Sequence, residues 1–202
     1  MSDTDTRRPR CDRCALPLST CVCALVTPVR NDVAVLVLQH PDEADEAKGS
    51  ARLLRLSLAR CRVVVGESFE PAMLRELLGG DVSGATLLYP PETARGTSQA
   101  TPAARPRQLV VLDGTWRKSL RMLHANPLLQ TLPRWSIESP AATRYRSLRK
   151  ARRPDQLSTL EATCAALAQL EEASARYAPL LDAFDRFVVD RRSRAPGAPS
   201  QK

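Results

Sequence analysis

The chain of 202 residues lacks the glycine motifs that bind phosphate in the common nucleotide-binding folds. Its eight glycines form neither GxGxxG nor GxxxxGK[ST], so a phosphate-cradling loop of the Rossmann or P-loop type is not the basis of its function. A GxSxG nucleophile elbow is also absent, and the only histidines are His40 and His124. A serine or cysteine triad would therefore have to use one of those two residues.

Long apolar runs are missing as well. No segment approaches the roughly 18 uninterrupted apolar residues of a membrane span, and the N-terminal stretch MSDTDTRRPR has no apolar core of the kind that a secretory signal needs. We therefore expect a cytoplasmic protein that does not bind membranes. Hydrophobic residues still make up 43% of the chain, which indicates one sizeable folded core with a small appendage.

Lysine is scarce, because 26 of the 30 basic residues are arginine, and the net charge is +8. The guanidinium fork suits phosphate oxygens, so nucleic acid is one interpretation of this charge. The other interpretation is that the arginine content reflects coding bias and a solvated surface. The positions of the basic residues favour nucleic-acid binding, because many of them cluster in one interval: Arg134, Arg144, Arg146, Arg149, Lys150, Arg152 and Arg153. We expect these arginines to form an RNA-binding rim.

Four of the six cysteines lie in the segment CDRCALPLSTCVC. Cys11 and Cys14 form CxxC, and Cys21 and Cys23 form CxC, an arrangement that suits tetrahedral Zn²⁺. Disulfides or free thiols are the alternatives, although nothing in the sequence indicates an oxidising compartment. Four thiolates would leave no open coordination position, so we expect a structural zinc site.

The rest of the chain alternates between strand and helix patterns. Residues 1–10 are expected to form a flexible basic leader, 11–28 a zinc knuckle, 29–191 an α/β domain and 192–202 a disordered tail. Apolar runs predict strands at 33–38, 63–65, 85–89, 109–112 and 134–137. Helices are predicted at 47–60, 71–78, 115–125, 158–176 and 180–191. This alternation predicts a mostly parallel sheet with helices on both faces, whose ligands bind beyond the carboxyl ends of the strands.

The segment VLDGTWRKSL places polar groups at such a strand end. Asp113 is either a functional carboxylate or the N-cap of the following helix. Thr115 either bonds a ligand or supports the turn. Trp116 either stacks on a ligand or packs in the core, where its spacing with Leu120 and Leu123 would place it.

Six segments in order carry a family resemblance. They are the CxxC and CxC pairs, QHPDE at 39–43, LLYPPETA at 87–94, LDGTWRKS at 112–119, NPLLQTLPR at 126–134 and LSTLEA at 157–162. Together they resemble the DTW-domain family, named for its D-x-T-W motif. The resemblance implies a tRNA-uridine aminocarboxypropyltransferase that moves the 3-amino-3-carboxypropyl group of S-adenosylmethionine to N3 of a tRNA uridine and releases 5′-methylthioadenosine. It also implies a SPOUT-like fold with a C-terminal knot, a rare exception among folds.

The resemblance implies catalytic roles for Asp113, Thr115 and Trp116. It places the donor against a larger set: Tyr89, Pro90, Leu112, Gly114, Ser158, Thr159 and Glu161. Ser158 and Glu161 also fit a capping box that begins a helix. An unperturbed aspartate, with a pKa of about 3.9, is a weak base for uridine N3, so Asp113 either is partly buried and accepts the proton or orients the uracil. For His40 we expect a loop-ordering role.

Two other functions stay open. One is a SPOUT-type methyltransferase, which would use the same donor but release S-adenosylhomocysteine. The other is a non-enzymatic, zinc-bearing RNA-binding module.

Overall fold

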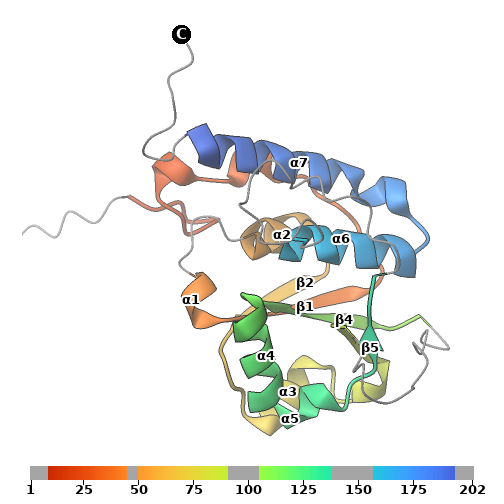
Figure 1. Ribbon diagram of the computed structural model, residues 1–202. Helices are drawn as coiled ribbons and strands as arrows, with labels where there is room; N and C mark the ends of the chain where they lie inside the picture. Colours follow the sequence, from red (N-terminus) through yellow and green to blue (C-terminus); the bar gives the residue numbers. More distant parts are fainter. Residues whose placement is uncertain (1–8, 45–49, 91–104, 138–156, 194–202) are drawn as a thin grey trace, which may run out of the picture.

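A parallel five-stranded sheet forms the centre of the protein (Figure 1). The structure, a computed structural model, describes residues 9–44, 50–90, 105–137 and 157–193. The strands are β1 (Ala34–Gln39), β2 (Cys61–Val65), β3 (Ala85–Leu88), β4 (Gln108–Asp113) and β5 (Arg134–Trp135), in the order β2-β1-β4-β3-β5. Every pairing is parallel, which confirms the predicted sheet.

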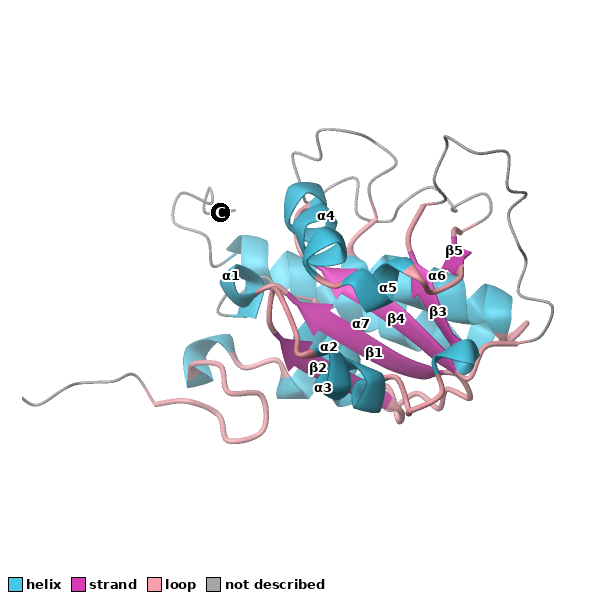
Figure 2. Ribbon diagram, turned by 90° about the horizontal axis from the view of Figure 1, so that it is seen from below, coloured by secondary structure: helices cyan, strands magenta, loops and turns pink. Residues whose placement is uncertain are grey.

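Helices cover both faces of the sheet (Figures 1 and 2). One face carries α2 (Ala51–Ser57), α6 (Thr159–Leu170) and α7 (Ser174–Ser193). The other carries α3 (Pro71–Leu77), α4 (Trp116–Ala125) and α5 (Pro127–Gln130), and the short α1 (Pro41–Ala44) follows β1 directly. Three 3₁₀ turns lie at Leu18–Thr20, Cys23–Leu25 and Val82–Gly84. None of the helices in the described part of the chain is both long and apolar enough to cross a membrane.

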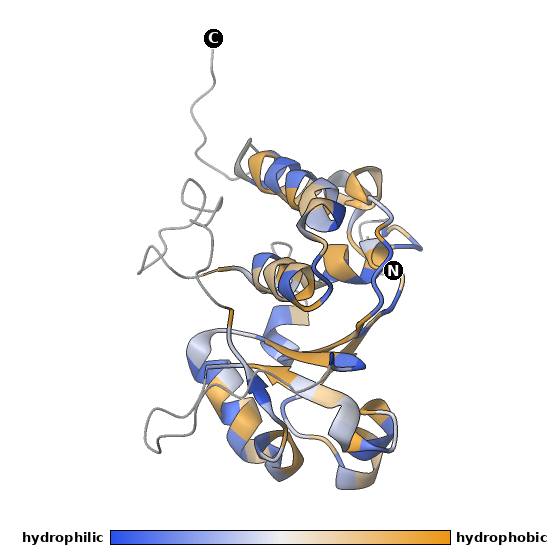
Figure 3. Cartoon of the chain, turned by 90° about the vertical axis from the view of Figure 1, so that its right-hand side faces the viewer, coloured by the Kyte–Doolittle hydropathy of each residue, from blue (hydrophilic) through white to orange (hydrophobic). Residues whose placement is uncertain are grey.

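The central strands β1 and β4 are apolar apart from their polar end residues because helices bury both of their faces. In β1, Val35 and Val37 belong to the core under α2, α6 and α7, whereas Leu36 and Leu38 belong to the core under α3, α4 and α5. Figure 3 shows the resulting apolar colouring along the strands between the two helical layers. A strand buried on both sides cannot alternate with polar residues, which explains the continuous Val and Leu runs.

The cysteine segment packs on the first of these cores through Leu16 and Val22, which are both buried. The division of the chain into leader, knuckle, domain and tail, and the C-terminal knot implied by the resemblance, remain predictions.

The predicted break between the last two helices is wrong. It was placed at 177–179, before Leu180, but α6 ends at Leu170 and α7 begins at Ser174. The turn between them carries Glu172 at φ 51°. Glu171 holds this turn, because its buried carboxylate accepts hydrogen bonds from the backbone N–H groups of Asp32 and Val33, at 2.8 Å each, and from Tyr177 Oη at 2.5 Å.

Candidate active site at the carboxyl edge of the sheet

Asp113 lies at the end of β4, opposite Gln39 at the end of the neighbouring β1. Its side chain is buried, with 7% of the residue exposed. Asp113 Oδ2 accepts a hydrogen bond from Gln39 Nε2 at 2.7 Å, and Oδ1 accepts one from Thr159 Oγ1 at 2.5 Å. The carboxylate therefore ties β1, β4 and the start of α6 together, and the two donors hold its plane in one orientation.

Asp113 is not the N-cap of α4, so that interpretation is wrong. The cap is Thr115, whose backbone is extended and whose Oγ1 accepts a hydrogen bond from the backbone N–H of Lys118 at 3.4 Å. Gly114, between Asp113 and Thr115, packs closely against the helix, because a Cβ on it would lie 3.0 Å from Lys118 Cβ. The strand can thus turn into the helix without displacing Asp113 from the sheet edge.

A cavity of about 360 Å³ opens beside Asp113, over the ends of β3, β4 and β5. Seven of the residues predicted from the sequence line it: Tyr89, Pro90, Leu112, Gly114, Trp116, Ser158 and Thr159. Glu161 supports the wall, because its Oε2 accepts from the Ser158 backbone N–H at 2.9 Å while Ser158 Oγ accepts from the Glu161 N–H, which completes the predicted capping box. We refer to this space as the first cavity.

Aromatic side chains form one side of the first cavity. The rings of Tyr89 and Trp116 stack with centroids 5.2 Å apart and planes 12° from parallel, and the Arg134 guanidinium lies 5.5 Å from the Tyr89 ring centroid. Trp116 is 56% exposed, so the core interpretation of this residue is wrong. The buried face of α4 carries Ser119, Met122 and Leu123 instead, which leaves Trp116 at the mouth of the cavity.

Two residues of this wall carry buried donor atoms. Tyr89 Oη and Trp135 Nε1 are inaccessible and make no hydrogen bond within the part of the chain that the structure describes. Burial raises the pKa of Tyr89, although Arg134 opposes the shift, so the phenol stays a neutral O–H donor. A buried polar group without a hydrogen bond costs about 1–3 kcal/mol, so an acceptor placed against either atom would be stabilising.

Comparison with known proteins places these observations in a family. A model of the DTW domain matches residues 8–192, nearly the whole chain. The chain belongs to the DTW-domain family. The D-x-T-W motif is Asp113, Gly114, Thr115 and Trp116, which form the buried carboxylate, the close turn, the helix cap and the aromatic wall.

Three curated relatives of this DTW protein carry the name tRNA-uridine aminocarboxypropyltransferase 2. The protein from Drosophila melanogaster is 29% identical over 84% of this chain and 70% of its own length. Those from Macaca fascicularis and Mus musculus are 27% and 29% identical, each over 82% of this chain. The chain spans only 58% of the length of these two mammalian relatives. No solved structure matches the chain significantly.

Gln39 is the main site residue that sequence reasoning missed. It lies in the quoted QHPDE segment at a strand end, but its place beside Asp113 depends on β1 and β4 being neighbours. Trp135 was missed as well, because a polar atom without a partner is visible only in the fold. His40, next to Gln39, is buried, and its Nδ1 accepts from the Asp42 backbone N–H at 3.2 Å while Nε2 lies 3.1 Å from Glu67 Oε2. This arrangement supports the expected loop-ordering role.

The four N-terminal cysteines of this DTW domain form one cluster, in which all the sulfur atoms lie within 4.8 Å of one another. The Sγ atoms of Cys11 and Cys23 are 3.6 Å apart, and those of Cys14 and Cys21 are 3.7 Å apart. A regular tetrahedron of 2.3 Å zinc–sulfur bonds has edges of about 3.8 Å, whereas a disulfide needs about 2.05 Å. All four are free thiols, and their spacing therefore fits a metal and not a disulfide.

The thiol pKa values in this cluster are split. Hydrogen bonds from the backbone N–H groups of Cys14 and Arg13 lower the pKa of Cys11 to about 6. Burial and the neighbouring Cys11 raise the pKa of Cys23 to about 12. A cation would favour the thiolate form at every position.

Of the arginines predicted to bind RNA, the structure describes one. Arg134 lies in β5, and its guanidinium contacts the ring of Tyr89, which lines the first cavity. The others lie outside the described residues: Arg144, Arg146, Arg149, Arg152 and Arg153.

Proposed function

We propose that the protein is a tRNA-uridine aminocarboxypropyltransferase that uses S-adenosylmethionine as donor and modifies N3 of a uridine. The observation that carries the proposal is the first cavity, where seven of the residues predicted from the sequence gather beside the buried D-x-T-W carboxylate. The names of the relatives point to the same reaction.

The residues of the first cavity suit the nucleoside part of the donor. Its volume of about 360 Å³ lies within the usual range for small-ligand pockets. Tyr89 O–H and Trp135 N–H can donate to purine nitrogens or ribose oxygens, which are acceptors. Trp116, which is exposed and stacked on Tyr89, offers a π-face that attracts both a nucleobase and the positive sulfonium.

In the proposed reaction, uridine N3 loses its proton and attacks the methylene carbon of the aminocarboxypropyl group that is bonded to sulfur. The new bond is N–C, the C–S bond breaks, and its electron pair stays on sulfur, which becomes the neutral thioether of 5′-methylthioadenosine. Both Asp113 oxygens already accept hydrogen bonds from Gln39 and Thr159. We therefore assign Asp113 to charge balance and orientation, and the N3 proton to water.

Two further components complete the proposal. A structural Zn²⁺ would be held by Cys11, Cys14, Cys21 and Cys23, whose thiols form a suitable tetrahedral donor set. The tRNA would be positioned by Arg134 and the arginines that follow it in sequence, so its affinity should fall steeply as salt rises.

The test is incubation of the purified full chain with S-adenosylmethionine, labelled in the aminocarboxypropyl group, and an unmodified tRNA transcript. Nucleoside mass spectrometry should find 3-(3-amino-3-carboxypropyl)uridine together with 5′-methylthioadenosine. Release of S-adenosylhomocysteine would assign a methyltransferase instead, and RNA binding without either by-product would assign a binding module.

A further inference from the structure

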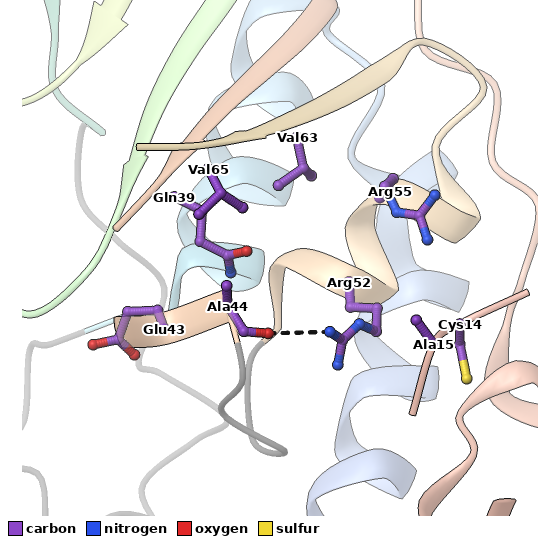
Figure 4. Close-up of a pocket in the computed structure, with 9 residues that line it drawn as sticks. All are labelled: Cys14, Ala15, Gln39, Glu43, Ala44, Arg52, Arg55, Val63 and Val65. Carbon is purple, nitrogen blue, oxygen red and sulfur yellow. Dashed lines mark hydrogen bonds between the residues drawn. The ribbon is translucent and has the colours of Figure 1, made fainter. Parts of the chain in front are cut away.

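A second cavity, of about 310 Å³, lies beside the first at the same sheet edge, over the ends of β1 and β2 (Figure 4). The residues that matter for its chemistry are Gln39, Glu43, Arg52 and Arg55. None of these belongs to the site predicted from the sequence. We call this space the second cavity.

Hydrogen bonds through Asp113 form a bridge that connects a wall residue of one cavity to a wall residue of the other. Gln39 lines the second cavity, Thr159 lines the first, and Asp113 joins the two side chains. Because neighbouring strands are about 4.8 Å apart, a step from above β3 and β4 to above β1 and β2 is roughly 10 Å. That distance is within the length of one extended ligand.

The orientation of the Gln39 amide follows from the charge of its partner. Asp113 Oδ2 can only accept, so Gln39 must point its Nε2 at the carboxylate, at 2.7 Å. Gln39 Oε1 is then available as an acceptor, and no donor meets it within the part of the chain that the structure describes. Figure 4 shows this amide directed toward Ala44, inside the second cavity.

Charged side chains of both signs line the second cavity together with this amide. Arg52 and Arg55 lie three residues apart on α2. Each guanidinium donates a hydrogen bond to a backbone carbonyl oxygen: Arg52 Nη2 to Ala44 O at 3.1 Å, and Arg55 Nη2 to Arg13 O at 3.3 Å. Glu43 lines the cavity beyond the amide, and its Oε1 accepts from Lys118 Nζ at 2.7 Å. Two guanidinium groups suit a carboxylate, and Gln39 Oε1 with Glu43 suits an ammonium group.

We propose that the second cavity binds the amino-acid end of the donor, with its carboxylate toward Arg52 and Arg55 and its ammonium toward Gln39 and Glu43. The inference rests on the proposed function, since it extends the same ligand from the first cavity. It explains which group is transferred. Anchoring the far end stretches the chain across Asp113, so the methylene next to sulfur lies over the bridge, where the acceptor can reach it.

The experiment compares two ligands in calorimetric titrations of the full chain. S-adenosylmethionine has the amino-acid end, and 5′-methylthioadenosine lacks it. Arg52→Gln combined with Arg55→Gln should weaken S-adenosylmethionine at least tenfold and leave 5′-methylthioadenosine unchanged. Arg75→Gln, on an exposed position of α3, is the matched control and should change neither. Arg55→Gln alone, at an exposed position of α2, gives a milder variant whose thermal melt should match wild type.

Three outcomes would overturn the inference. Unchanged S-adenosylmethionine affinity in the double variant would do so while leaving the proposed function intact, provided that wild type binds both ligands. A loss of tRNA affinity with donor affinity retained would make the second cavity a phosphate site instead. If wild type binds neither ligand, the inference and the proposed function fail together.

Discussion

Replacement of Asp113 by asparagine tests the centre of the site, because it removes the charge and keeps the size. The carboxylate accepts two hydrogen bonds, at 2.7 and 2.5 Å, in a position that is 7% exposed. Bonds to a charged group contribute about 1.5–3 kcal/mol each and neutral bonds about 0.5–1.5 kcal/mol. If the Gln39 amide flips, the asparagine keeps both hydrogen bonds as neutral ones, so we expect the free energy of unfolding to fall by about 2 kcal/mol. At about 2–4 °C per kcal/mol for a chain of this size, the melting temperature should fall by about 4–8 °C.

The effect on turnover should be larger than the effect on folding. A fixed group aimed at charge that changes in the transition state is worth about 10²–10³ in rate when it is removed. Single-turnover transfer from labelled S-adenosylmethionine to tRNA, beside a thermal melt, separates the two quantities. Turnover of Asp113→Asn within threefold of wild type would refute the role assigned to the carboxylate.

A paired substitution sharpens this test. Gln39→Glu combined with Asp113→Asn moves the charge to the neighbouring strand and reverses the hydrogen bond, since the asparagine amide now donates. We expect the melting temperature to recover while turnover stays low. Recovery of turnover as well would mean that the hydrogen-bond geometry matters and the position of the charge does not.

Three further predictions concern the metal, the donor pocket and the α6–α7 turn. Elemental analysis of the purified protein should find one zinc per chain, and the Cys14→Ser variant should lose the zinc and melt at a lower temperature. A wild-type protein that contains no metal and melts at the same temperature as Cys14→Ser would contradict the zinc site. Trp135→Phe removes a donor that makes no hydrogen bond to the described residues, so the free energy of unfolding should hold while affinity for S-adenosylmethionine falls about tenfold. Unchanged affinity would count against the pocket. Burial and the Glu171 hydrogen bond raise the pKa of Tyr177 in the folded protein. The protonated phenol therefore contributes its full stability below the pKa of the unfolded chain, which is about 10. That contribution is lost as the pH rises toward the higher pKa of the folded protein. In denaturant titrations, the stability difference between wild type and Tyr177→Phe should therefore shrink above pH 10, and a constant difference would show that the buried phenol is not linked to folding.

The elements of the sheet could be predicted because their signals are local. Strands buried on both faces have continuous apolar runs, and the helices between them begin at recognisable caps such as Ser158 with Glu161. The break at Glu171 could not be predicted, because two of the donors that hold its carboxylate, the backbone N–H groups of Asp32 and Val33, lie about 140 residues away.

The chemistry of the site divides in the same way. The cysteine spacing, the D-x-T-W motif at a strand end and the family are properties of short segments, and the sequence by itself determined them. Strand order decided the rest, since only the pairing of β1 with β4 brings Gln39 to Asp113, and only the packing of α4 through Met122 and Leu123 turns Trp116 outward. Such pairings depend on contacts between residues far apart in the chain, and periodicity within one segment carries no information about them.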